Sequence, residues 1–173
     1  MSTLERLRLL VCEEGEPIAT AVLAAVRPHH DPSPATIAAG GPRSRSAPEE
    51  YELLVEAIYE GYLLHYGESR IVSAADPDLA LLAGDRLYTL GLERLVALGD
   101  LDAVRELADV IALCSLLVGR GDRASCEPLW RAGARAVGWG AEDRYVRAKS
   151  LVRDGAADAA AELAALDQRG SPA

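Results

Sequence analysis

The fold of this chain is decided by residues 76–119, which read DPDLALLAGDRLYTLGLERLVALGDLDAVRELADVIALCSLLVG. Asp76 is a good helix cap, and Pro77 suits the first turn of the helix that follows. Leucines then recur at helical spacing until Gly99, which favours a helix end. Asp100 caps a second helix directly afterwards. Two long helices with so short a connection predict an antiparallel pair within an all-α protein.

Similar start and stop signals lie on both sides of this pair. Pro48 and the two acids after it predict a helix that ends at Gly67. We expect helices at residues 3–26 with a break near Gly15 and Pro17, and at 48–66, 77–98, 100–118, 125–137, 141–153 and 155–167. Residues 28–47 are rich in proline, glycine and serine and predict a loop with a helical turn near residues 35–39, while residues 168–173 should fray. The prediction is one all-α domain over residues 1–173, a bundle of about seven helices.

The predicted helix at residues 100–118 is unusual because its second half is apolar nearly all round. From Val110 to Val118 no charged residue occurs. A helix of this kind belongs either in the centre of a bundle or in an interface between subunits.

Composition and charge exclude several classes of protein. The net charge is −9, so the chain repels nucleic acid and anionic membrane surfaces. The longest uncharged apolar runs are about half the length that spans a bilayer, which predicts no membrane insertion. The three cysteines are widely spaced, which is typical of a reducing compartment, and no leader segment is visible. We therefore expect a cytoplasmic protein.

Three short stretches carry a family resemblance. Residues 40–45, GGPRSR, are similar to a Gly-Gly-Lys-Arg-Leu-Arg stretch, and residues 56–65, EAIYEGYLLH, to a helix that reads E-x-I-H and then L-x-H. Residues 81–87, LLAGDRL, are similar to a helix that reads A-x-L-A-G-D-x-L. In this order they resemble the trans-isoprenyl diphosphate synthase family. The resemblance implies a shortened form of the all-α isoprenoid synthase fold.

The chain departs from that family where the family carries its chemistry. In the family, the histidine that aligns with His65 is followed by an aspartate-rich motif, DDxxD, whose carboxylates hold Mg²⁺ on the substrate diphosphate. Here residues 66–70 read YGESR, and Glu68 is the one acid among them. The family's lysine in the first stretch is Pro42. We therefore expect no cofactor, and Mg²⁺ only if the chain is a diverged enzyme.

Seven side chains remain as candidates for a ligand site: Arg43, Arg45, Tyr62, His65, Glu68, Arg70 and Asp85. Both arginines of the first stretch could hold phosphate, since guanidinium matches it with two parallel hydrogen bonds. The residues around His65 could bind an anionic small molecule, or His65 could simply face the negative end of its helix. None of the seven is assigned a catalytic or metal-binding role.

The other candidates have a structural alternative as well. Asp85 could belong to a polar site, or it could bond to a neighbouring helix while Gly84 lets the two helices approach closely. Tyr62 shares a helix face with Tyr59 and Tyr66, which could line a pocket or an interface, or form a stripe at the edge of the core. The cluster of His29, His30 and Asp31 has the residue types of a metal site, but we interpret it as a solvated turn because no further ligand lies at a suitable spacing.

Three functional hypotheses follow. The leading one is a non-catalytic helical protein that acts by association, either as a homodimer or as an accessory subunit of a prenyl diphosphate synthase. The second is a protein that binds an isoprenoid or another small anionic ligand. The third is a diverged prenyltransferase-like enzyme, which the missing aspartates disfavour.

Overall fold

The computed structural model describes residues 1–27, 32–73 and 75–168. Within this part the chain is 72% helical and contains no strand, so the all-α class is confirmed. The helices are α1 (Thr3–Cys12), α2 (Ile18–Ala21), α3 (Pro34–Ala39), α4 (Pro48–Tyr66), α5 (Pro77–Ala97), α6 (Leu101–Gly119), α7 (Cys126–Trp139), α8 (Asp143–Asp154) and α9 (Ala159–Gln168), with a 3₁₀ turn η1 (Arg123–Ser125). Seven of the nine α-helices described are seven residues or longer. No helix in the described ranges is long and apolar enough to cross a bilayer.

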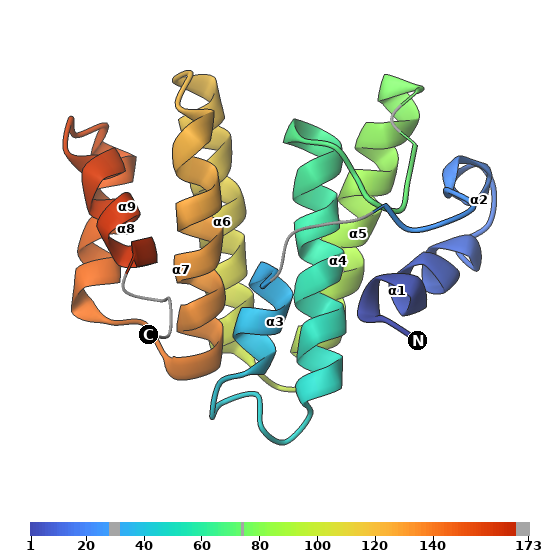
Figure 1. Cartoon of the computed structure of the whole chain (residues 1–173), viewed down its shortest axis with the longest axis horizontal. Coiled ribbons are helices and arrows are strands. Elements are labelled where there is room, and N and C mark those ends of the chain that lie inside the picture. The colour runs from blue at the N-terminus through green and yellow to red at the C-terminus, as the bar shows by residue number, and fades with distance from the viewer. Residues whose placement is uncertain (28–31, 74, 169–173) are drawn as a thin grey trace.

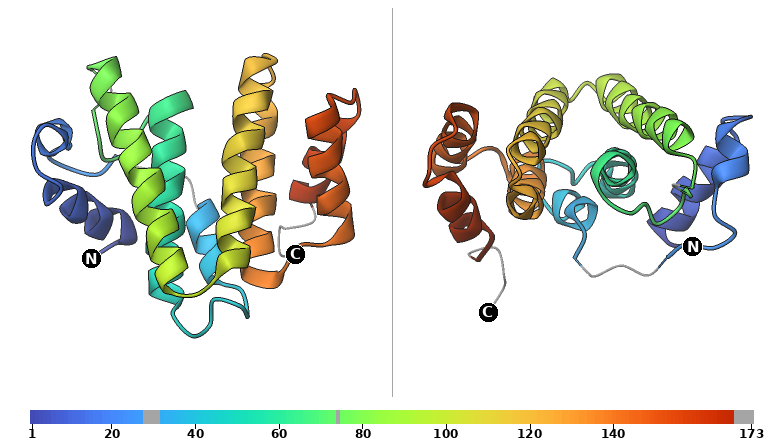
Figure 2. Two further views of the ribbon diagram at one scale, coloured as in Figure 1. Left: turned by 180° about the vertical axis from the view of Figure 1, so that it is seen from behind. Right: turned by 90° about the horizontal axis from the view of Figure 1, so that it is seen from above.

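Two antiparallel helix pairs, α4 with α5 and α6 with α7, form the centre of the molecule (Figure 1). The short helix α3 lies between α4 and α7 and contacts both. Helices α1 and α2 cover the α4–α5 pair on one flank, and α8 and α9 cover the α6–α7 pair on the other. Seen from behind, α5 and α6 are the nearest elements (Figure 2). The molecule is therefore a row of helix pairs rather than a bundle around one axis.

Most helix ends follow the predicted capping chemistry. The Asp76 carboxylate accepts hydrogen bonds from the backbone N–H groups of Asp78 and Leu79, at 3.0 and 3.2 Å. The Asp100 carboxylate accepts one from the N–H of Ala103, at 3.0 Å. These bonds satisfy donors that have no partner within the helix, which is why α5 and α6 begin at the predicted positions.

The predicted continuation of the first helix to residue 26 is wrong. Helix α2 ends at Ala21, and the chain then runs extended beside residues 70–73. The N–H of Leu23 bonds to the carbonyl oxygen of Ile71 at 2.8 Å, and the N–H of Arg27 bonds to that of Arg70 at 2.9 Å. Both segments lie against the α4–α5 pair. The hydrogen bonds between the two segments replace those that a helix would make. Tertiary pairing therefore overrides the local helix propensity of this alanine-rich stretch.

Helix α7 begins and ends close to the predicted range of residues 125–137, and two local contacts set its bounds. Ser125 makes no side-chain cap, because Asp122 takes that role for the preceding 3₁₀ turn and accepts from the Ser125 N–H at 3.3 Å. Gly138 does not break the helix, which continues to Trp139. A β-carbon at Gly138 would lie 2.7 Å from the carbonyl oxygen of Ala38. This glycine therefore serves close packing against α3 rather than a helix end.

The buried apolar side chains form two clusters that meet along α4. The larger cluster joins α3, α4, α6, α7, α8 and α9 with Leu95 of α5, and the smaller joins α1, α2, α4 and α5 with the segment at residues 71–72. Helix α4 contributes several residues to each cluster, and twelve of its nineteen residues are buried. Helix α4 therefore lies where the two clusters meet, and α6 belongs to the second central pair.

Glycines allow α4 and α5 to approach closely. A β-carbon at Gly91 would lie 2.4 Å from Ile58 Cγ1 and 2.7 Å from the carbonyl oxygen of Leu54. Any side chain at this position would therefore clash with both atoms unless α4 and α5 moved apart. We expect Gly91→Ala to lower the free energy of unfolding by about 1–3 kcal/mol, because the helices must separate. Gly119→Ala is the matched control, since a β-carbon there meets no atom within 4 Å.

Urea denaturation followed by circular dichroism measures both variants. Gly119→Ala should be neutral or slightly stabilising, because alanine is the better helix former. Equal stability of the two variants would contradict the close packing of α4 on α5.

Candidate functional site

The seven candidate ligand residues lie in two groups at opposite ends of α4. Arg43 and Arg45 precede the start of α4, whereas His65 closes the helix and Glu68 follows it. A helix of nineteen residues is about 27 Å long. The two groups therefore do not share one ligand site in this arrangement.

The two arginines before α4 differ in their surroundings. Arg43 Nη2 lies 3.3 Å from the Asp100 carboxylate and 3.7 Å from that of Asp102, so its charge is already matched. Its backbone N–H also bonds to the carbonyl oxygen of Gly138, at 3.0 Å. Arg45 is exposed on the same loop. Arg43 thus ties the loop to the start of α6 and the end of α7.

His65 is held between α4 and α5. Its ring stacks on that of Tyr88, with 5.2 Å between centroids and 7° between planes. Asp85 Oδ1 lies 3.1 Å from His65 Nε2 at an angle that makes no hydrogen bond. A β-carbon at Gly84 would lie 2.8 Å from the same imidazole, which shows how closely the helices approach. Gly84 thus lets the two helices approach closely, whereas Asp85 makes no hydrogen bond to His65.

Glu68 pairs with Arg27 at the surface, where 80% of the Glu68 side chain is exposed. Within residues 1–27, 32–73 and 75–168, no three His, Cys, Asp or Glu side chains converge as metal ligands would. The Mg²⁺ that the enzyme alternative requires therefore has no ligand set in this part of the chain. The cluster at residues 29–31 lies outside the described residues.

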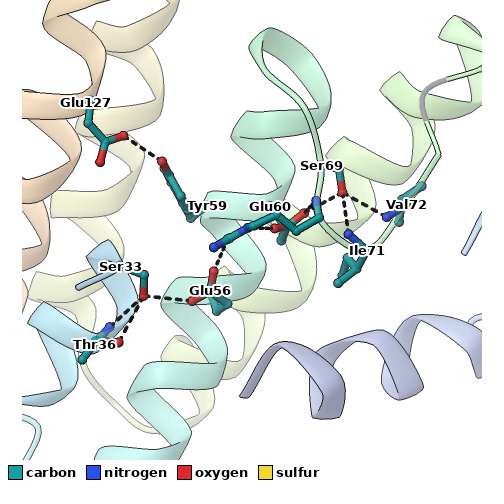
Figure 3. Close-up of polar contacts among 10 residues, drawn as sticks. Ser33, Thr36, Glu56, Tyr59, Glu60, Ser69, Ile71, Val72 and Glu127 are labelled. Carbon is teal, nitrogen blue, oxygen red and sulfur yellow. Dashed lines mark hydrogen bonds and ion pairs between the residues drawn. The ribbon is translucent and has the colours of Figure 1, made fainter. Parts of the chain in front are cut away.

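Arg70 is the one member of the predicted set that joins a buried polar network, in which Glu56, Glu60 and Ser69 are labelled in Figure 3. Its Nε donates to Glu60 Oε1 at 2.5 Å, and its Nη2 donates to Glu56 Oε1. Both glutamates come from α4, one turn apart, and both are buried. Ser33, at the start of α3, donates to Glu56 Oε2 at 3.1 Å. The network thus joins α3, α4 and the segment after α4.

The same network fixes the chain that follows Glu68. Ser69 Oγ and the backbone N–H of Arg70 both donate to Glu60 Oε2, at 2.6 and 3.0 Å. Ser69 Oγ also accepts from the N–H groups of Ile71 and Val72 (Figure 3). Since residues 70–73 in turn bond to residues 21–27, Glu60 indirectly positions the N-terminal helices as well.

Burial dominates the electrostatics of this network. Desolvation raises the pKa of Glu56, the Arg70 charge opposes that rise, and the Glu60 charge adds to it. The net direction is upward, which is what two carboxylates sharing one guanidinium produce. Within the described residues, each side-chain hydrogen bond of Glu56, Glu60 and Arg70 is to another residue of the network. We interpret the network as a structural clasp that replaces water around buried charges.

A stripe of aromatic side chains continues from the clasp along α4. Tyr59 and Tyr62 stack at 5.8 Å between centroids, and both contact the fully buried Trp130 of α7, at 5.2 and 5.4 Å. Tyr59 also donates to Glu127 Oε2 at 2.7 Å (Figure 3). Tyr62 is 6% exposed, so it packs in the core between the two helix pairs rather than lining an open pocket.

One surface carries an uncharged apolar stripe, which the sequence indicated only as a broad apolar helix. On α6, residues that step by three or four are exposed or partly exposed and carry no charge: Leu101, Val104, Ala108, Ile111, Ala112, Ser115 and Leu116. On α5, Leu81, Tyr88 and Leu92 form a shorter row at the same spacing. We call these ten residues the α5–α6 face. Both helices lie toward the viewer in the left panel of Figure 2.

Two charges of α6 lie away from this face, whereas Arg105 is exposed on it beside Leu101 and Ala108 and pairs with Asp102 at 3.1 Å. Glu106 and Asp109 pair with Lys149 of α8, whose Nζ lies 2.9 and 3.0 Å from their carboxylates. Asp85 interrupts the row on α5 and lies against His65. Helix α6 therefore carries an exposed stripe that is uncharged from Ala108 to Leu116 and that includes the charged Arg105 nearer its N-terminal end.

No family model matches the chain, and neither a curated protein nor a solved structure matches it.

Proposed function

We propose that this protein acts by association rather than by catalysis, and that the α5–α6 face joins two copies of the chain. One observation carries the proposal. The exposed stripe of α6 is uncharged from Ala108 to Leu116, with Leu116 41% exposed, and Arg105 is its one charged member. Contiguous exposed apolar surface is unusual on a monomer and marks interaction sites.

The low charge of the face, in contrast to the rest of the chain, permits a second copy as its occupant. Each copy carries −9, so two copies repel each other over most of their surface. A two-fold interface brings the same patch of both subunits together, so the patch must be complementary to itself in shape and charge. The uncharged part of the stripe, from Ala108 to Leu116, meets this condition, whereas an acidic surface does not. We therefore expect pairing that becomes tighter as salt screens the remaining repulsion.

Matched alanine-to-glutamate substitutions test the interface. Ala108→Glu and Ala112→Glu place a charge on exposed positions of the stripe, so they add like charges at the two-fold interface without altering the core. We expect both to reduce the dimer, of twice the 18.4 kDa chain mass, to a monomer in size-exclusion chromatography with light scattering. Ala160→Glu, at an exposed position of α9, is the control and should stay dimeric. If Ala108→Glu and Ala112→Glu have the same dimer mass as Ala160→Glu, this interface is contradicted.

A prenyl diphosphate synthase subunit is the alternative occupant, and it rests on the resemblance of residues 40–87 to that family. An apolar helix face suits a partner that presents helices of its own. Purification of the chain from its native cells separates the two cases. A synthase recovered in equal amount would replace the second copy as the partner, and its loss with Ala112→Glu would place it on the same face.

A further inference from the structure

A second surface feature, far from the α5–α6 face, has the character of a small-molecule site. Helices α3, α7, α8 and α9 enclose a groove of about 350 Å³. Its wall is formed by Ile37, Ala132, Ala136 and Leu166, and the Trp139 ring lies at its rim, 47% exposed. A concave apolar surface of this volume falls within the range of ligand pockets in proteins.

Positive charge gathers around this groove although the chain as a whole is acidic. Arg131, Arg135 and Arg144 all line it. Arg144 Nε lies 3.2 Å from a Glu162 carboxylate oxygen, and Arg131 donates to the carbonyl oxygen of Pro32 at 3.1 Å. Glu142 is the one acid among the lining residues. The lining therefore carries more positive than negative charge.

Arg135 is the residue that best fits an incoming anion. Among the described residues, no carboxylate lies within 4.0 Å of its guanidinium, in contrast to Arg144. Its Cζ lies 5.4 Å from the centroid of the Trp139 ring. Stacking on an indole holds the guanidinium in place and leaves N–H donors at its edge for an acceptor. Arg135 is thus a positioned cation whose charge no described side chain neutralises.

The bottom of the groove is suited to an apolar group. Tyr145 lies there, but its hydroxyl donates to Glu106 Oε1 at 2.5 Å on the side of α6. The hydroxyl is therefore engaged elsewhere, and the ring presents an apolar surface beside Ala136 and Leu166. Because the groove pairs an apolar floor with a cationic rim, it matches a molecule that has an apolar body and an anionic head.

We propose that the groove binds a small amphipathic anion, with a carboxylate or phosphate head on Arg135 and a short apolar chain along Ala132, Ala136 and Leu166. Guanidinium recognises both head groups through paired charge-assisted hydrogen bonds. The site does not use the α5–α6 face, so it stands independently of the pairing of two copies. The ligand is a soluble molecule rather than a membrane lipid, because a chain of charge −9 is repelled by an anionic bilayer.

Isothermal titration with octanoate, octyl phosphate and the uncharged octanol tests this site on the full chain. We expect saturable binding of both anions and much weaker binding of octanol. Arg135→Gln should weaken the anions at least about tenfold, since it removes a charge-assisted contact. Arg147→Gln is the control, because Arg147 is an exposed arginine of α8 outside the groove, and it should bind like the wild type.

Three results would overturn the proposal. The first is equal affinity of octanoate for Arg135→Gln and Arg147→Gln, with both variants folded by circular dichroism. The second is binding of octanol as tight as that of octanoate, which would leave the cationic rim without a role. The third is binding to vesicles with anionic headgroups but not to either soluble anion, which would assign the same chemistry to a membrane surface.

Discussion

Replacement of Arg70 by methionine is expected to lower the free energy of unfolding by about 3–5 kcal/mol, because it leaves two buried carboxylates without their cation. The Glu60 side chain is fully buried and that of Glu56 is 3% exposed, so water cannot take over the role of the guanidinium. Methionine preserves most of the apolar stem of the arginine, so the loss reports the charge rather than the packing. Urea denaturation at neutral pH measures this loss in the free energy of unfolding.

Arg27→Met is the matched control for this prediction. Arg27 also pairs with a glutamate, but its side chain is 43% exposed and that of Glu68 is 80% exposed. Exposed pairs of this kind contribute less than about 1 kcal/mol, since water solvates both partners when the pair is broken. Similar losses for Arg27→Met and Arg70→Met would show that the clasp is no more important than a surface pair.

The cost of Arg70→Met should depend on pH in a defined direction. Without the guanidinium, burial and the Glu60 charge raise the pKa of Glu56 in the folded state further above the ordinary 4.5. The folded variant then binds more protons than the unfolded chain at any pH between 4.5 and that raised value. The contribution of Glu56 to stability is therefore fully present below pH 4.5 and is lost as the pH rises through its raised pKa. A larger deficit at acidic than at neutral pH would contradict this direction.

Truncation of Trp130 to alanine is expected to cost about 3–5 kcal/mol, because it empties the fully buried contact between α7 and the tyrosines of α4. Trp130→Phe should cost much less. Phenylalanine keeps most of the ring, and it removes an indole N–H that is buried without a hydrogen-bond partner among the described residues. Trp139→Ala is the control, since that ring is 47% exposed, and it should cost under about 1 kcal/mol.

Thermal or urea denaturation followed by far-ultraviolet circular dichroism compares the three variants. The order of stability should be Trp139→Ala above Trp130→Phe above Trp130→Ala. A loss for Trp130→Phe equal to that for Trp130→Ala would mean that the indole N–H has a partner whose removal is costly.

The helices that carry their own boundary signals were predictable from the sequence. Pro48, Asp76 and Asp100 each begin a helix where expected, because proline and aspartate act within one turn of their own position. The extended path after Ala21 was not predictable, because it depends on hydrogen bonds to residues 70–73, which are distant in sequence. The same reason applies to Gly138, whose role is set by a contact with α3.

The buried network was only partly visible in the sequence. Arg70 was among the candidates, but its partners Glu56 and Glu60 were not, since glutamates on a helix usually face water. One signal could have revealed them. They are the two charged residues of the stretch 53–64, where every other residue is uncharged, and they lie one helical turn apart. A pair of acids on the same face of such a helix indicates burial against a basic partner.

The sequence indicated the α6 part of the α5–α6 face, and the structure added the α5 part. The apolar run in residues 110–118 offered two interpretations, the centre of the bundle or a subunit interface. The structure places α6 in one of the two central helix pairs and leaves one side of it exposed. That exposed side is the basis of the proposed interface, which stays a prediction.

Sedimentation equilibrium of the unmodified chain, over a range of concentrations and at two salt concentrations, tests that proposal most directly. We expect a mass of twice 18.4 kDa at high protein concentration, with tighter association at the higher salt. A mass of 18.4 kDa at every concentration and both salt concentrations would contradict the pairing of two copies through the α5–α6 face.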